Sequence, residues 1–87
     1  MDTKDLILEE SEAVTKLLIL KNKAYGDSAL KPAGIFASGD AVDNLCCRID
    51  DKIMRIKMRG ITDETEDTVQ DLIGYLILLK VALRQKK

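Results

Sequence analysis

The strongest indication of the fold comes from one stretch of the sequence, Arg48-Ile49-Asp50-Asp51-Lys52-Ile53-Met54-Arg55. At helical spacing its charged residues share one face: Arg48, Asp51, Lys52 and Arg55. An apolar stripe lies about a quarter-turn away and consists of Val42, Leu45, Ile49, Ile53 and Ile56. The charged row therefore borders the packed side of an amphipathic helix, where partial loss of water strengthens binding to an anion or a counter-charge. An ordinary solvated face with internal ion pairs is the alternative.

The composition indicates one small domain. The chain has 87 residues, of which 46% are apolar and only 3% aromatic, so aliphatic side chains must form the core. Charged residues nearly balance at a net charge of −1, which argues against binding to duplex nucleic acid. The most apolar stretch, Leu72 to Leu83, contains Lys80 and is too short to span a bilayer, so we expect no membrane partner. The acidic N-terminus argues against a signal peptide.

Cys46 and Cys47 are adjacent, and the sequence has no other cysteine. Neighbouring helix positions point about 100° apart, so these two cannot form a normal local disulfide. With no histidine and no C-x-x-C motif, a structural zinc site is not expected. We therefore expect a reduced, cytoplasmic chain.

Hydrophobic periodicity predicts three helices, at about 3–23, 41–59 and 63–84, with a long structured loop at 24–40. Asp40 is a candidate N-cap of the second helix and Gly60 its end, while Asp63 with Glu66 is typical of a capping box for the third. The third helix is apolar on most faces, more than two neighbouring helices can cover. The sequence therefore predicts an all-α three-helix bundle, a single domain over 1–87, that assembles as a homo-oligomer.

Several acidic side chains are candidates for binding a metal ion. Glu10 projects inside the apolar face of the first helix, where a carboxylate must be paired, protonated or bound to a ligand. Asp67 and Asp71 lie one turn apart on a line that continues to Gly74, and the short connection 60–63 lets them reach toward the cations of the second helix. The alternative for Glu10 is a side chain that leans out or pairs with an arginine of another helix, and the alternative for the two aspartates is a structural cluster of ion pairs. The candidate metal ligands are Glu10, Asp51, Asp67 and Asp71.

The loop after the first helix offers groups that bind phosphate and stack on a base. Tyr25-Gly26-Asp27-Ser28 is turn chemistry, and so long a loop in a small domain is usually functional or disordered. Lysine and serine side chains donate to phosphate, and Tyr25 can stack on a nucleobase. The candidate ligand-binding residues are Lys21, Lys23, Tyr25, Ser28, Lys31, Arg48, Lys52 and Arg55. A disordered loop with incidental lysines is the alternative.

Three segments in this order carry a resemblance to a known family. They are Lys21-Asn22-Lys23-Ala24-Tyr25-Gly26-Asp27-Ser28, the opening stretch 48–55, and Glu66-Asp67-Thr68-Val69-Gln70-Asp71-Leu72-Ile73-Gly74-Tyr75. Together they resemble the phage-associated nucleotide modification associated domain, type 1, over about residues 20 to 83. The resemblance implies nucleotide-linked biology, in the cytoplasm of the host cell if a phage encodes the protein.

A weaker resemblance is to MazG-like all-α NTP pyrophosphatases, which hold Mg²⁺ with a Glu-Glu-x-x-Glu helix and a later Glu-x-x-Asp helix. Here the first helix has Glu9, Glu10 and Glu12, with Ala13 in the place of the third ligand. The acids of the later helix, Asp67 and Asp71, are four residues apart, whereas the Glu-x-x-Asp motif has a spacing of three. Both departures bear on catalysis because Mg²⁺ demands near-octahedral oxygen geometry.

Three functions are compatible with the sequence. The first is a nucleotide-binding protein that sequesters a nucleotide second messenger of host antiviral defence without cleaving it and without a cofactor. The second is a Mg²⁺-dependent nucleotide pyrophosphohydrolase that uses the acidic residues. The third is a helical protein-interaction module. We favour the first, because cations and hydrogen-bonding groups are abundant while the sequence offers no convincing nucleophile, general base or complete set of metal ligands.

Overall fold

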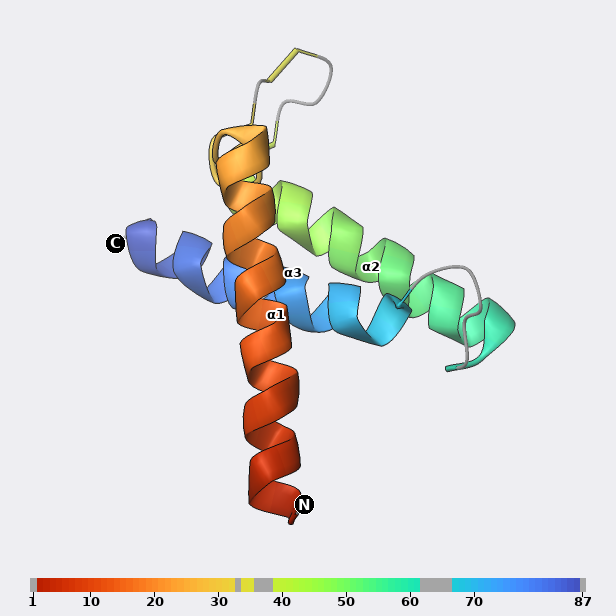
Figure 1. The fold of residues 1–87 in the computed structure, drawn as a ribbon. Helices are drawn as coiled ribbons and strands as arrows, with labels where there is room; N and C mark the ends of the chain where they lie inside the picture. The colour runs from red at the N-terminus through yellow and green to blue at the C-terminus, as the bar shows by residue number, and fades with distance from the viewer. Residues whose placement is uncertain (1, 33, 36–38, 62–66, 87) are drawn as a thin grey trace.

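The computed structural model describes residues 2–32, 34–35, 39–61 and 67–86. These residues form three α-helices and contain no strand: α1 (Thr3–Tyr25), α2 (Ala41–Arg59) and α3 (Thr68–Gln85). Figure 1 shows α2 and α3 side by side and antiparallel, while α1 crosses them steeply and its N-terminal half extends away from them. The all-α class is therefore confirmed for the described part of the chain. None of these helices is both long enough and apolar enough to cross a membrane.

α2 begins and ends where the sequence predicts. The Asp40 carboxylate accepts the N–H of Asp43 at 2.9 Å, which satisfies one free donor of the first turn. Gly60 follows the last residue with φ 84°, a conformation that side chains rarely adopt, and its N–H donates to the carbonyl of Ile56. Leu45, on the apolar stripe, is only 1% exposed and is the largest fully buried side chain among the described residues.

α3 begins later than the predicted residue 63. Asp67 has a non-helical backbone, and its carboxylate accepts the N–H of Gln70 at 2.9 Å, so this residue is the N-cap and Thr68 starts the helix. The predicted capping box of Asp63 and Glu66 lies outside the described residues. The prediction of the helix start was wrong because the sequence places several residues that can act as N-caps close together: Thr62, Asp63, Thr65 and Asp67.

Glu10 does not face a core. It is exposed, as are all residues from Asp2 to Ala13. α1 packs against α3, and the first buried residue along α1 is Val14. The helix face on which Glu10 lies is thus covered only from Val14 onward, so Glu10 is not core-facing and its side chain leans out into solvent.

The cap of α2 makes the stability of the protein depend on pH. The N–H of Asp43, and to a lesser extent the Lys86 ammonium at 3.5 Å, lower the pKa of the Asp40 carboxyl. A carboxyl with a lowered pKa in the folded state stabilises that state above the usual aspartate pKa and loses this contribution as pH falls through the folded value. We expect Asp40→Asn to lower the Tm slightly at neutral pH, with a difference from the wild type that disappears in acid. Thermal denaturation across the acid range measures this, with the exposed Asp50→Asn on the same helix as control; a difference that stays constant with pH would contradict it.

Candidate functional site

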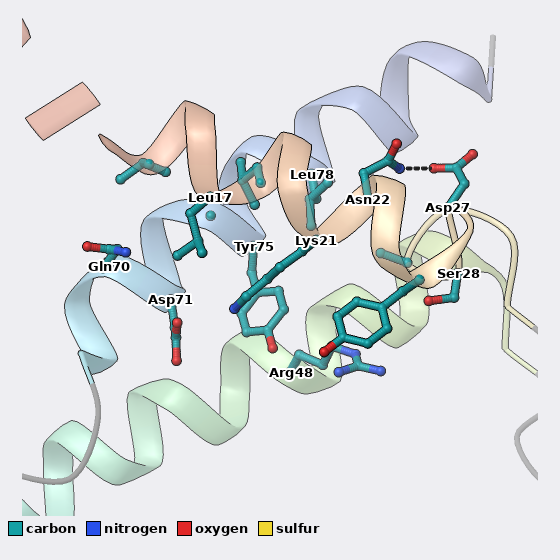
Figure 2. Close-up of a pocket in the computed structure, with 15 residues that line it drawn as sticks. Leu17, Lys21, Asn22, Asp27, Ser28, Arg48, Gln70, Asp71, Tyr75 and Leu78 are labelled. Carbon is teal, nitrogen blue, oxygen red and sulfur yellow. Dashed lines mark hydrogen bonds between the residues drawn. The ribbon is translucent and has the colours of Figure 1, made fainter. Parts of the chain in front are cut away.

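A cavity lies where the end of α1 meets α2 and α3 (Figure 2). Its volume is about 220 Å³. Its floor is aliphatic and is formed by Val14, Leu17, Leu18 and Leu78. Its polar groups come from all parts of the fold: Lys21 and Tyr25 from α1, Ser28 from the following turn, Arg48 from α2 and Tyr75 from α3. The cavity thus combines an apolar base with two cations and two aromatic rings.

The turn after α1 is held in place by local hydrogen bonds. Gly26 has φ 62° and its N–H donates to the Asn22 carbonyl, which ends the helix at Tyr25 rather than at the predicted residue 23. The Asn22 side-chain amide then donates to the Asp27 carboxylate at 2.7 Å. This bond fixes the turn that carries Ser28 to the cavity, and Figure 2 shows it at the edge of the site.

An ion pair joins α2 and α3 beside the cavity. The Lys52 ammonium donates to the Asp71 carboxylate at 3.1 Å, and the two side chains are only 12% and 22% exposed. The predicted reach of an α3 acid toward the α2 cations is confirmed for this pair. Asp71 also lines the cavity, so Lys52 offsets the negative charge that Asp71 brings there.

Arg48 and Tyr75 lie against each other within the cavity. The guanidinium carbon is 6.0 Å from the centre of the Tyr75 ring, at the outer limit of a cation–π contact. Figure 2 shows Lys21 reaching from α1 toward the same ring. The cavity is therefore lined by a cation from α2 that lies near a tyrosine ring and by a second cation from α1.

Gly74 allows α1 to approach α3 closely. A Cβ atom at this position would lie 3.1 Å from Cδ2 of Leu18, tighter than an ordinary van der Waals contact. The absence of a side chain at Gly74 thus makes room for the Leu18 side chain, and this contact brings the cavity-lining end of α1 over α3.

The structure brings together half of the predicted ligand-binding residues. Those that line the cavity are Lys21, Tyr25, Ser28 and Arg48. Those that do not line it are Lys23, Lys31, Lys52 and Arg55. Lys31 lies 4.0 Å from Asp27 on the outside of the turn, and Lys52 holds Asp71.

The predicted metal ligands are spread over the molecule. Asp71 pairs with Lys52, Asp67 caps α3, and both Asp51 and Glu10 are exposed. Within the described residues, no three acidic, histidine or cysteine side chains lie close enough together to hold a metal ion.

Tyr75, Asn22, Asp27 and Gln70 were not among the candidate ligand-binding residues, although all four lie in the segments that carry the family resemblance and all four line the cavity. A signal for Tyr75 was present in the composition. The chain has only two tyrosines, and both line this cavity, although they are far apart in sequence.

Comparisons of the chain with family models, with curated proteins and with solved structures gave no match.

Proposed function

We propose that this protein binds a small phosphorylated nucleotide in the cavity between α1, α2 and α3 and does not cleave it. The observation that carries the proposal is the convergence of two cations and both tyrosines on one apolar cavity. Ligand pockets are typically apolar hollows with a few well-placed polar groups, and this cavity has that composition.

Arg48 and Lys21 supply the phosphate-binding groups. An arginine side chain presents a planar fork of donors that matches the geometry of a phosphate, while a lysine acts as a more mobile point charge. The two acids of the lining are already paired with cations, because Lys31 lies 4.0 Å from Asp27 and Lys52 lies 3.1 Å from Asp71. The local balance of charge therefore favours an anion, although the chain as a whole has a net charge of −1.

Tyr25 and Tyr75 supply aromatic surfaces for a nucleobase. Stacking of a base on an aromatic side chain contributes about 1–3 kcal/mol and tolerates any base. The cavity of about 220 Å³ is smaller than the roughly 300–1,000 Å³ of typical small-molecule sites, so it encloses part of a nucleotide and leaves the rest at its mouth.

The three segments that resemble the nucleotide modification associated domain all contribute to this cavity, with residues from 21–28, Arg48, and residues from 70–75. This convergence supports a nucleotide-linked role for them. In the phage setting that the resemblance implies, tight binding without cleavage would sequester a nucleotide second messenger of host antiviral defence.

Equilibrium dialysis of the purified protein against a panel of linear and cyclic nucleotides, with and without Mg²⁺, tests the proposal. We expect retention of at least one nucleotide at micromolar concentration, independently of Mg²⁺. The retained ligand should be recovered unchanged after the protein is denatured, which mass spectrometry verifies.

Two results would contradict this expectation. Release of pyrophosphate or of a nucleoside monophosphate that requires Mg²⁺ and stops in Asp71→Asn would show a pyrophosphohydrolase instead. Retention of no nucleotide from the whole panel would leave a helical protein-interaction module as the remaining function.

We also infer that the chain acts as a homo-oligomer. A compact folded chain of 9.7 kDa exposes about 5,100 Å², whereas this chain exposes 7042 Å². Its radius of gyration is 14.3 Å, against about 12 Å for a compact domain of this length. The excess surface of about 1,900 Å² exceeds the roughly 800 Å² that one partner buries in a standard interface.

A further inference from the structure

The N-terminal half of α1 is a helix without a covered face in the single chain. Every residue from Asp2 to Ala13 is exposed, including three large aliphatic side chains, Leu6, Ile7 and Leu8. Figure 1 shows this half extending well beyond α2 and α3. Isolated helices of this length are marginal in water, so a projecting amphipathic helix requires a packing partner.

One stripe along α1 has the spacing of a helix-pairing seam. Its positions follow steps of four and three residues, which is the heptad pattern of coiled coils. They are Leu6, Glu10, Ala13, Leu17, Leu20 and Ala24. Leu6 and Leu20 are 50% and 65% exposed, and both alanines are exposed as well. Leu17 is half-buried because it also borders the cavity.

This stripe is symmetric about Thr15, which suits it to pairing with a reversed copy of itself. Reversal places Leu6 opposite Ala24 and Leu17 opposite Ala13, so that a large side chain meets a small one in these two pairs, and it places Glu10 opposite Leu20. Alternation of large and small residues across facing positions lets two helices interlock without voids.

The charges of α1 are divided between its two halves. The acids of the helix and its N-cap all lie in the first half: Asp2, Asp5, Glu9, Glu10 and Glu12. The second half carries Lys16, Lys21 and Lys23 and no acid, and Lys4 is the one exception to this division. Parallel pairing would place acid against acid, whereas antiparallel pairing places acids against lysines.

We propose that two copies of this chain pair through α1 in antiparallel orientation, with the six-residue stripe as the seam and the two-fold axis near Thr15. Two acidic residues then come close to lysines of the second copy: Glu9 and Lys23 flank the seam on the same side, and Glu10, which lies opposite Leu20, is next to Lys21. The pairing explains why Glu10 interrupts an apolar stripe, because its carboxylate meets a cation only when the second copy is present. The proposal rests on the homo-oligomer inferred above and not on nucleotide binding.

Light scattering on matched variants at tens of micromolar tests the seam. The wild type should have a mass of two chains, or of a larger even number, and Leu20→Glu should reduce it to a smaller assembly. Ile19→Glu is the control, because Ile19 is its neighbour on α1 and is equally exposed at 65% but lies off the stripe. Both variants should keep the helicity of the wild type, since both residues are exposed and glutamate forms helices well.

Crosslinking tests the orientation. In a background with Cys46→Ser and Cys47→Ser, we expect oxidation of a mixture of Leu6→Cys and tagged Ala24→Cys proteins to link the two different variants. Leu6→Cys alone should not crosslink, because antiparallel pairing holds the two copies of this position at opposite ends of the seam.

The results of these experiments distinguish a failure of the oligomer inference from a failure of the proposed seam. A wild-type mass near 9.7 kDa would overturn both inferences. An oligomer that survives Leu20→Glu, or that only Ile19→Glu dissociates, would overturn the seam alone. Self-crosslinking of Leu6→Cys would overturn the antiparallel orientation.

Discussion

Replacement of Arg48 by alanine is expected to weaken nucleotide binding by about ten- to a hundredfold, because a hydrogen bond to a charged group contributes about 1.5–3 kcal/mol. Arg48 is exposed and lines the cavity, so its removal takes away a phosphate-binding group without opening the core. Tyr75 also loses the guanidinium that lies 6.0 Å from its ring. Dialysis with the nucleotide identified from the panel measures the loss of affinity.

Arg59→Ala is the matched control for this variant. Arg59 is an exposed residue at the end of the same helix, about 16 Å along the axis from Arg48, and it does not line the cavity. We expect it to leave affinity unchanged. If Arg48→Ala lost helicity in proportion to its loss of binding, Arg48 would be part of a structural ion pair rather than a ligand group.

Replacement of Leu45 by alanine is expected to destabilise the fold by about 2–5 kcal/mol, the cost of removing a large buried aliphatic side chain and leaving a cavity. Leu45 is the largest fully buried side chain among the described residues, and the other buried apolar ones are the smaller Val14 and Ala82. Folded domains have a total stability of about 5–15 kcal/mol, and a small core such as this one belongs at the low end. We therefore expect a large fall in the midpoint of urea denaturation.

The control for this experiment is Ile53→Ala, on the same apolar stripe of α2 but 51% exposed. It should change the free energy of unfolding by much less. Both variants must be compared at one protein concentration, because association stabilises the folded chain by mass action. Equal effects of the two substitutions would mean that Ile53 is buried in the assembly.

The parts of the fold that could be predicted are those encoded by short-range chemistry. The bounds of α2 follow from an acid that can cap its first turn, Asp40, and from a glycine that can adopt positive φ after its last, Gly60. The pair of Lys52 and Asp71 follows from helical spacing once the two helices are antiparallel. The bounds of α2 depend on local geometry that is the same in any fold, and the ion pair needs only helical spacing and the antiparallel arrangement of α2 and α3.

The parts that could not be predicted depend on which face of each helix is covered. Helical periodicity places Glu10 on the same face as Val14, but only the three-dimensional crossing of α1 and α3 shows that the cover begins at Val14. Lys23 and Lys21 are close in sequence, yet only Lys21 lines the cavity, since two residues along a helix turn a side chain by about 200°. Tyr75 belongs to a segment that carries the family resemblance, but it joins the site through packing between helices, which helical periodicity does not predict.

The gathering of both tyrosines at one cavity has a practical consequence. The chain contains no tryptophan, so its intrinsic ultraviolet emission comes from these two phenol rings alone. Quenching of that emission would report that a ligand occupies the cavity, without any attached dye. Tyr25→Phe and Tyr75→Phe proteins would show whether the quenched ring is the one on α1 or the one on α3.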